Sequence, residues 1–374
     1  MPNLADKTSS PIKGPIERNP GSLNRYAYNL LNNDEKAVYD TVFEAIKAFG
    51  TELSNLNASV TDAQVQIIVD YIQRDHPEIF WFQHGATYYF DTATHIVNRI
   101  ELKYCMTQDE AQKRQEKIDA ATKSFLTSVT DTMSDYEATL HIYENIIKLV
   151  DYDTIGLERQ KRTTVTAEVP DDLRSIYGVF VNKKAVCAGY AKAMQYLLNL
   201  CGIECTYVTS DTHAWNLIKL EGDYYHMDVT WGDGSDTKKD KAQTDTINYD
   251  CFCITTAELA RLESHTPESS FPLPECTATK CNYHRRHGLY FETYDFDRVR
   301  SIVCESVKLN KLDVSFKFSS SKVFSEAKKQ LVDDGKFREA IQFASLKANT
   351  KLNSSYMYSV RDDKLTIAFF ITKM

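Results

Sequence analysis

The sequence contains no long hydrophobic run, although 43% of its 374 residues are hydrophobic. No stretch approaches the roughly 18 consecutive apolar residues that a membrane-spanning helix needs. The first thirty residues also lack the basic and then apolar pattern of a signal peptide. We therefore expect no membrane span, and the apolar content suffices for a substantial core in two or three structural units.

Acidic residues outnumber basic residues, 52 to 44. The formal net charge is −8 and the isoelectric point is near 5.7. An acidic protein of this kind does not attract nucleic acid through its overall charge. Only a local basic patch could do so. We expect no nucleic-acid partner.

Cysteine is not abundant enough for a disulfide scaffold. Nine cysteines, an odd number, in a chain too long to need disulfide stapling favour a reducing compartment. Cys276 and Cys281 flank a short polar loop and could pair in an oxidising setting. The location therefore stays open between the cytoplasm and the mature part of an exported or surface protein.

Local patterns divide the chain into four parts. Residues 1–24 hold four of the nine prolines without hydrophobic periodicity, which predicts a flexible tail or a tether left after removal of a leader. Residues 25–130 are predicted as a region of helices with a small sheet, residues 131–290 as the catalytic core, and residues 291–374 as an α+β module. We find no internal repeat.

Two helices and a hairpin are predicted at the start of the ordered chain. The first helix begins near Asn33 and ends with Gly50 at the C′ position. The second follows a capping box at Thr61 and ends at His76, which precedes a proline. Residues 87–104 are rich in β-branched and aromatic side chains and predict a hairpin.

Periodicity predicts further elements on both sides of the core. A charged pattern over residues 107–129 indicates a long exposed helix, and a capping box at Ser134 precedes another helix that ends near Val150. Residues 295–308 and 321–346 have a helical period, and strands are predicted over residues 312–318, 356–360 and 365–371.

Cys187 is predicted to open a helix. The residues that follow, AGYAKAMQYLLNLCG, are apolar at helical spacing, and Gly202 suits the C′ position. At a helix N-terminus the partial positive charge favours the nucleophilic thiolate, and unpaired N–H groups could donate to an oxyanion. The alternative is an inert core cysteine.

His213 and Asp228 are predicted to share one face of a hairpin. The strands 212–220 and 223–230 are joined by a tight Glu-Gly turn. With a four-residue loop His213 lies directly opposite Asp228, and with a two-residue loop it lies diagonal to Asp228 on the same face. A satisfied polar contact in a sheet is the alternative interpretation.

A carboxylate beside an imidazole holds one tautomer and leaves the other nitrogen for a nucleophile. We therefore predict that Cys187, His213 and Asp228 form a catalytic triad, with His226 as the rival base because it shares the face of the aspartate. Four aromatic residues are candidates for substrate binding: Trp215, Trp231, Tyr177 and Tyr190. The two tryptophans could line an acyl-substrate channel or be core aromatics.

The charged and cysteine-rich segments do not predict a metal site. The acidic run GDGSD at residues 232–236 does not fit the EF-hand spacing, which favours a solvated turn. The basic run HRRH at residues 284–287 is predicted as a solvated loop. A zinc site would use a spacing that is not among the common ligand patterns, from Cys251, Cys253, Cys276, Cys281, His284 and His287. We predict no metal and no cofactor.

Two segments, VCAGYAKAMQYLLNLCGIECTYV and HAWNLIKLEGDYYHMDVTW, resemble the transglutaminase-like superfamily, particularly its bacterial members. The likeness covers roughly residues 134–290. The family's cysteine at a helix start, histidine of the HAWN strand and aspartate of the D-x-TW strand match Cys187, His213 and Asp228.

The resemblance implies a papain-like α+β core, in which a helix that bears the cysteine packs on an antiparallel sheet that bears the histidine and the aspartate. It also implies a thiolate that attacks a carboxamide, forms a thioester and releases ammonia or an amine. The implied partners are a protein or peptide with glutamine or another amide and a primary amine acceptor. A cysteine protease or amidase with the same triad, and a catalytically inactive binding module, stay open as alternatives.

Overall fold

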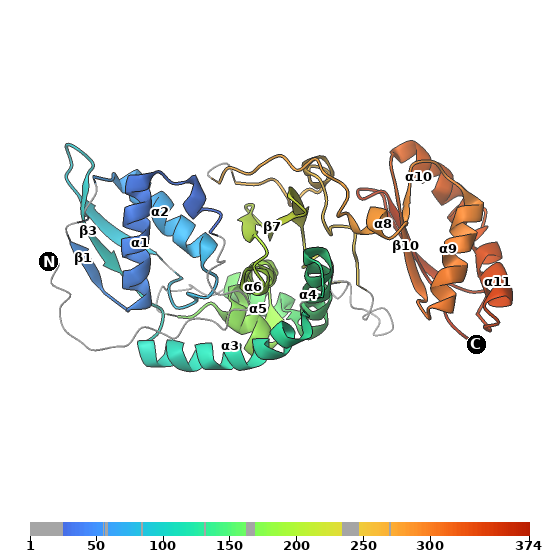
Figure 1. Cartoon of the computed structure of the whole chain (residues 1–374), viewed down its shortest axis with the longest axis horizontal. Helices are drawn as coiled ribbons and strands as arrows, with labels where there is room; N and C mark the ends of the chain where they lie inside the picture. The colour runs from blue at the N-terminus through green and yellow to red at the C-terminus, as the bar shows by residue number, and fades with distance from the viewer. Residues whose placement is uncertain are drawn as a thin grey trace.

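The computed structural model describes residues 25–54, 56, 59–83, 85–130, 132–161, 169–233, 247–268 and 271–374. Helices and small, mostly antiparallel sheets alternate along these residues, which makes the fold α+β. The molecule is elongated, with the N-terminal sheet and the C-terminal sheet at opposite ends and α6 between them (Figure 1). The predicted flexible tail lies outside the described residues.

None of the helices within those ranges combines the length and the apolarity that crossing a bilayer requires.

The N-terminal part is a three-stranded antiparallel sheet with two helices. Its elements are η1 (Tyr28–Leu30), α1 (Asn33–Lys47), β1 (Glu52–Ser54), α2 (Asp62–Asp75), β2 (Ala86–Phe90) and β3 (Val97–Leu102). The strand order is β1-β3-β2, so the predicted hairpin is confirmed and β1 adds a strand that the sequence did not suggest. The capping box at Thr61 and the helix end at His76 are also confirmed.

The end of α1 differs from the prediction. Phe49, not Gly50, takes the left-handed C′ conformation, with φ of 53°. The N–H of Gly50 donates to the carbonyl of Ala45 at 2.9 Å, which completes a Schellman motif with glycine one residue further on. The Phe49 ring stacks on Trp81 at 5.7 Å between centroids, and this contact offsets the roughly 1–2 kcal/mol cost of a left-handed non-glycine residue.

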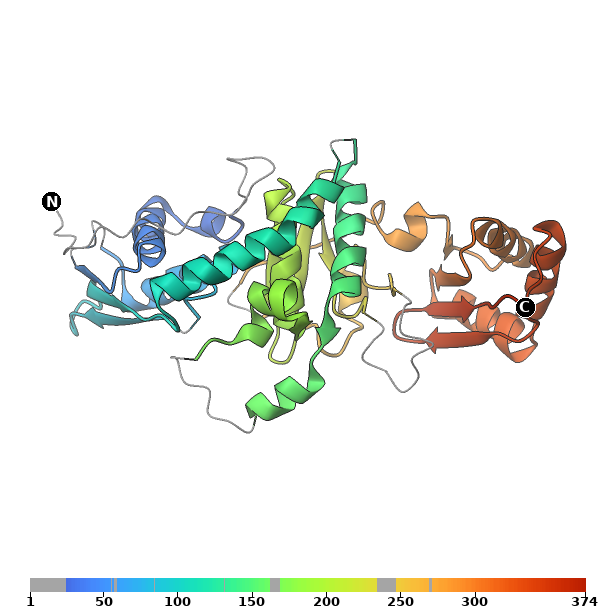
Figure 2. The ribbon, with the colours of Figure 1, turned by 90° about the horizontal axis from the view of Figure 1, so that it is seen from below.

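The central part carries the predicted triad. Its helices and turns are α3 (Gln108–Ser128), α4 (Asp135–Leu149), α5 (Thr154–Lys161), η2 (Asp172–Arg174), η3 (Gly178–Asn182), α6 (Cys187–Leu200), α7 (Thr256–Leu259) and α8 (Tyr283–Arg286). Its strands are β4 (Asp151–Tyr152), β5 (Lys184–Ala185), β6 (Cys205–Thr209), β7 (Ala214–Leu220) and β8 (Asp223–Met227). The long helix α3 runs from the N-terminal part to the central part (Figure 2), so one of its faces is buried and it is less exposed than predicted.

Helix α6 packs against β6 and β7 of a three-stranded antiparallel sheet with the order β6-β7-β8. Most of its side chains are buried, as expected for a helix that is apolar around most of its circumference. Asn216 of β7 donates its amide N–H to the carbonyl of Ala191 at 2.9 Å, which fixes the helix to the sheet. Gly202 takes φ of 78° after the helix, so its C′ role is confirmed.

Three clusters of buried hydrophobic side chains lie among the described residues, and the smallest of them surrounds Trp215 in the central part. One continuous cluster of buried side chains extends from Ala27 to Cys281 and joins the N-terminal and central parts. A second cluster contains only residues between Phe291 and Ile371. The C-terminal part therefore has a core of its own.

The C-terminal part is a four-stranded sheet with helices on one face. Its elements are β9 (Tyr290–Phe291), α9 (Phe296–Lys308), β10 (Asp313–Phe318), α10 (Ser321–Lys328), η6 (Lys329–Asp333), α11 (Phe337–Lys347), β11 (Met357–Arg361) and β12 (Thr366–Phe370). The strand order is β11-β12-β10-β9. The helical period predicted over residues 321–346 is interrupted at Gly335, whose φ of 70° ends one helix before the next begins.

The basic run at residues 284–287 is not a solvated loop. His284 lies in α8 and is fully buried, with Nε2 at 3.2 Å from Oγ of Ser315. Burial lowers the pKa of His284 to about 4. Arg285 and Arg286 form ion pairs with acidic side chains at 3.0 and 2.6 Å. The run is therefore divided between the core and the surface, and it forms no basic patch.

A buried polar cluster joins the central part to the C-terminal sheet. The carboxylate of Asp250 accepts hydrogen bonds from Nη1 of Arg361 at 2.8 Å and from Oγ1 of Thr366 at 2.9 Å. Nζ of Lys317 lies 2.8 Å from Oε1 of Glu258. Burial alone would raise the pKa of Asp250, but the surrounding cations, with Arg361 foremost, lower it.

We predict that Asp250→Ala destabilises the C-terminal part, because it removes a buried carboxylate and leaves the partly exposed guanidinium of Arg361 and the buried hydroxyl of Thr366 without their shared partner. Loss of one member of a buried ion pair typically costs about 3–5 kcal/mol. Urea unfolding followed by circular dichroism measures the change. The control Asp362→Ala removes an exposed carboxylate 3.6 Å from Lys328 and should leave unfolding unchanged. Equal unfolding midpoints for the two variants would contradict the prediction.

Candidate active site

The hairpin of β7 and β8 sets the geometry of the site. Leu220 pairs with Asp223, so the loop has two residues. Glu221 and Gly222 both have positive φ, 51° and 89°, as a type I′ turn requires. The predicted hairpin is thus confirmed in its two-residue register, which places His213 diagonal to Asp228.

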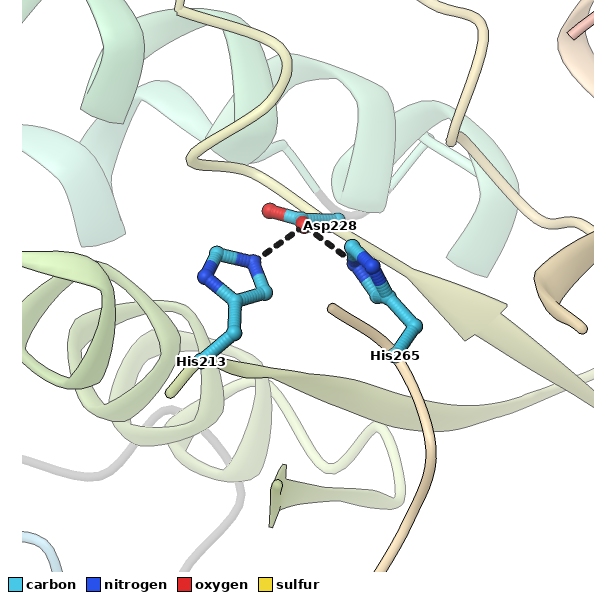
Figure 3. Close-up of side chains that lie close together, drawn as sticks. All are labelled: His213, Asp228 and His265. Atoms are coloured by element: carbon cyan, nitrogen blue, oxygen red, sulfur yellow. Dashed lines mark hydrogen bonds and ion pairs between the residues drawn. The ribbon is translucent and has the colours of Figure 1, made fainter. Parts of the chain in front are cut away.

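His213 and Asp228 form a hydrogen-bonded pair. Nε2 of His213 lies 2.7 Å from Oδ2 of Asp228, and the aspartate side chain is 2% exposed (Figure 3). An ionised carboxylate only accepts hydrogen bonds, so the histidine donates through Nε2. The other ring nitrogen, Nδ1, points away from the carboxylate (Figure 3) and is left for a nucleophile.

A second histidine shares the same carboxylate oxygen. Nε2 of His265 lies 2.8 Å from Oδ2 of Asp228, and His265 is fully buried. The remaining oxygen of Asp228, Oδ1, accepts the backbone N–H of Trp231 at 2.9 Å. The carboxylate therefore receives three hydrogen bonds. The sequence prediction missed His265, because it lies 37 residues from Asp228 in an irregular segment with no periodic signal.

The backbone around both histidines is linked by one serine. Ser210 accepts the N–H of His213 on its hydroxyl at 3.1 Å and donates that hydroxyl to the carbonyl of Ser264 at 2.7 Å. The β6–β7 turn and the segment that carries His265 are thereby held together.

Asp228 is fixed from its backbone as well as its side chain. Its N–H donates to the carbonyl of Cys251 at 3.0 Å, and the hydroxyl oxygen of Tyr143 lies 3.2 Å from the Asp228 carbonyl and 2.8 Å from that of Asn248. A Cβ on Gly232 would lie 2.0 Å from that hydroxyl oxygen, so only glycine fits there. The tyrosine can approach Asp228 because this position has no side chain.

Cys187 is the first residue of α6, as predicted, and its free thiol is partly exposed. The residue before it, Val186, provides no side-chain cap, so the first-turn N–H groups are not taken up by one. The thiol is close enough to His213 to contribute to the pKa of the imidazole. The structure thus brings the three predicted residues to one place.

His213 and Asp228 shift each other's pKa in opposite directions. Burial by itself would lower the pKa of His213, but the charge and hydrogen bond of Asp228, with a contribution from Cys187, raise it to about 10. Burial would raise the pKa of Asp228, but His213 and His265 hold it well below its usual range. The site therefore contains an imidazolium and a carboxylate at neutral pH.

The rival base His226 does not contact the carboxylate. Its Nδ1 accepts the indole N–H of Trp215 at 3.2 Å, and its Nε2 lies 3.4 Å from Oγ1 of Thr256. Burial, together with the nearby His265, lowers the pKa of His226 to about 4. His226 is thus a neutral core histidine, and His265 occupies the place beside Asp228.

The four predicted substrate-binding aromatics are not equivalent. Trp215 and Tyr190 are fully buried, and the hydroxyl oxygen of Tyr190 lies 2.6 Å from Oδ2 of Asp233, to which it donates, and 3.0 Å from the carbonyl of Val150. Tyr177 is buried beneath the guanidinium of Arg114, 4.5 Å from its ring. These three are core residues in the structure, because packing covers their rings. Trp231 alone of the four is partly exposed.

The cysteines considered for zinc or for a disulfide are free and buried. Within the part of the chain that the structure describes, one group of potential metal ligands lies close together, and it consists of His213, Asp228 and His265, with ligand atoms within 4.8 Å. Because both histidines donate Nε2–H to the aspartate, hydrogen bonds account for this geometry. Most of the acidic run, residues 234–236, lies outside the described residues.

Comparisons with known proteins point to one family. Residues 120–229, which include all three predicted triad residues, match the family model described as the transglutaminase-like superfamily. This region belongs to the transglutaminase-like superfamily.

The curated relatives are mammalian proteins named kyphoscoliosis peptidase. The mouse and the human protein are each 28% identical to this chain over 153 residues, which cover 36% of this chain and 21% of the relative. The matched part therefore spans about a fifth of the length of these relatives. The resemblance to bacterial members stays a prediction.

A solved structure described as "Crystal structure of a TGase" aligns with 39% of this chain and 43% of its own. Its TM-score is 0.28 and its identity is 11%, so it adds nothing to the assignment.

The coupled His213–Asp228 pair predicts a defined dependence of stability on pH. A raised histidine pKa contributes stability that is full below about 6.5 and is lost as the pH rises through about 10. A lowered aspartate pKa contributes stability above about pH 3.9 that is lost as the pH falls through its folded-state value. The stability difference between the unmodified protein and His213→Gln should therefore be largest near pH 4–6.5 and decline steadily towards pH 10.

Urea unfolding at a series of pH values measures this difference. The control is His95→Gln, which changes a histidine whose side chain is 58% exposed and should alter stability little. A stability difference for His213→Gln that is constant from pH 6 to 10 would exclude a charged pair.

Proposed function

We propose that the protein catalyses cysteine-dependent acyl transfer from protein or peptide amides, with Cys187 as nucleophile, His213 as acid and base, and Asp228 as the group that orients His213. The observation that carries the proposal is the bond from Nε2 of His213 to the buried carboxylate, which leaves Nδ1 for a thiol at the start of α6. The transglutaminase-like family assignment supports the same roles.

The first half-reaction forms a thioester. The Cys187 thiolate attacks the carbonyl carbon of a carboxamide, and the new oxyanion lies where first-turn N–H groups of α6 can donate to it. The imidazolium of His213 then gives its proton to the departing nitrogen, so ammonia or an amine leaves and the acyl group stays on sulfur. His213 is neutral after this step.

The second half-reaction releases the acyl group. Neutral His213 removes a proton from a primary amine or from water as that acceptor attacks the thioester carbonyl. An amine gives an isopeptide bond, and water gives deamidation or peptide hydrolysis. In either case the C–S bond breaks, the thiolate returns and His213 is again protonated.

Hydrolysis is the second candidate function. The curated relatives are named peptidases, and this chain is 28% identical to them over 153 residues. Water would then be the acceptor, and a peptide bond could be the amide that is cleaved. The same three residues would act in the same roles.

His265 acts as a positioning residue in this proposal. It donates to the same oxygen of Asp228 as His213 does, from a fully buried site, and its Nδ1 lies 3.1 Å from Oγ of Ser264. A third hydrogen bond on the carboxylate keeps that group ionised and fixed in orientation. His213 is thereby held in one tautomer and one ring position.

We predict that Cys187→Ala abolishes incorporation of a labelled primary amine into an unfolded glutamine-containing protein such as casein. His213→Ala and Asp228→Asn should lower the rate by about 10²- to 10⁴-fold, since they remove acid–base catalysis. Mass spectrometry of the product separates amine transfer from deamidation and from peptide cleavage.

The matched control is Cys201→Ala, which removes a second partly exposed cysteine at the other end of the same helix and should retain full activity. The proposed function fails if the three triad variants and the unmodified protein give identical products. The inactive binding module is then the reading that stands.

For His265 we expect His265→Ala to lower kcat by about 10- to 100-fold, as for loss of one hydrogen bond to a charged group, with KM unchanged. Without the hydrogen bond from His265, the negative charge of Asp228 interacts more strongly with His213, so the pKa of His213 rises further. Proton NMR of the imidazole resonances can follow this change. His265→Gln keeps a donor and should restore part of the rate. An effect on KM alone, or an unchanged His213 pKa, contradicts the positioning role.

A further inference from the structure

A large cleft separates the central part from the C-terminal sheet. Its volume is about 910 Å³, at the upper end of the roughly 300–1,000 Å³ typical of ligand sites. Residues on both sides line it, including Trp231, Asn248 and Tyr249 of the central part and Ser301, Ser359 and Lys364 of the C-terminal part. Helix α8 of the central part lies beside the sheet that contains β10 (Figure 1).

The floor of the cleft is the polar face of the C-terminal sheet. The register places Ser315, Ala368 and Ser359 in one row across β10, β12 and β11. These side chains are small, so the row leaves depth above it, and two of the three offer hydroxyl groups. The opposite face of the sheet carries the apolar side chains of the second core.

The neighbouring row fastens the sheet to the central part. Lys317, Thr366 and Arg361 are aligned in the register, and they contact Glu258 and Asp250 as described above. A buried ionic row beside an open row of small side chains fixes the width of the cleft. The cleft is therefore held by the same contacts that dock the C-terminal part.

An edge strand forms one rim of the cleft. β11 is the last strand in the order β11-β12-β10-β9, and its Tyr358, Ser359 and Arg361 line the cleft. An extended peptide can add to such an edge through main-chain hydrogen bonds, with side chains choosing the sequence.

The charges on the cleft wall are mixed. The cleft is lined by the cations Lys311, Arg361 and Lys364 and by the carboxylates Asp233, Glu305 and Asp313. A site for a polyanion such as nucleic acid would present one sign of charge. Mixed charges, hydroxyls and aromatic rings suit a polypeptide segment.

Trp231 contacts both the cleft and two of the proposed catalytic residues. This tryptophan lines the cleft, its ring lies 6.0 Å from the ring of His213, and its N–H donates to Asp228. Nζ of Lys364, from the β11–β12 turn, lies 4.1 Å from the centre of the indole. The C-terminal part thus contacts the aromatic residue that borders the triad.

Resting on the proposed acyl transfer, we infer that this cleft binds an extended, unfolded segment of the protein substrate and leads its reactive amide past Trp231 to Cys187. The C-terminal part would then select the polypeptide, and the central part would carry the chemistry. This assigns a role to a module that contains no residue of the proposed triad.

Binding can be measured without catalysis. Full-length Cys187→Ala is titrated against fluorescently labelled casein, used as an unfolded glutamine-containing polypeptide, and anisotropy gives the dissociation constant. Adding Ser359→Trp fills the row of small side chains from the sheet, and adding Ser301→Trp in a separate protein fills the cleft from α9. Each should weaken binding at least about 10-fold. The matched control Ser325→Trp lies on an exposed face of α10 outside the cleft and should bind as the parent does.

Two separate wall variants are used so that misfolding of one does not decide the result. Circular dichroism tests whether each variant is folded. Casein binding that is absent in the parent, or equal in the parent and both wall variants, overturns the cleft proposal. Turnover of a blocked glutamine dipeptide by the unmodified protein tests the chemistry separately. Absence of that turnover counts against acyl transfer, and the binding result still decides the cleft.

Discussion

The buried carboxylate of Asp228 is the group on which the rest of the site depends. Desolvation alone would neutralise it, and two histidine N–H groups and one backbone N–H keep it charged. Those donors come from three separate segments: the start of β7, the irregular stretch after α7 and the turn after β8. A charge that costs several kcal/mol to bury is therefore also the constraint that draws these segments to one point.

The larger architecture supports this arrangement from two sides. On one side α6, almost wholly buried, brings Cys187 to the sheet and is fixed there by Asn216. On the other side Tyr143 of α4 reaches the Asp228 carbonyl across a glycine that leaves room for its hydroxyl. The first hydrophobic core thus positions the nucleophile and the acid–base pair together, and the C-terminal part, with its own core, is joined to it by ionic contacts around Asp250.

Sequence patterns predicted most helices and strands, because capping boxes, helical spacing and alternation are local signals. Two of the failures, at Phe49 and His284, came from contacts with residues distant in the sequence, and the one at Gly335 was local. Phe49 takes a position that favours glycine because its ring stacks on Trp81, and the helical period after residue 321 is broken by Gly335. The sequence predicts that His284 belongs to a solvated basic loop, whereas in the structure it is buried and contacts Ser315 of β10.

For the site, the sequence by itself determined the residue types, the helix start at Cys187 and the two hairpin registers that keep His213 and Asp228 on one face, because each depends on neighbours a few positions away. Only the tertiary structure decided that His265 and not His226 meets the carboxylate, and that Trp215, Tyr177 and Tyr190 lie in the core. These outcomes depend on contacts between segments tens of residues apart. Burial and packing, which no local pattern encodes, determine them.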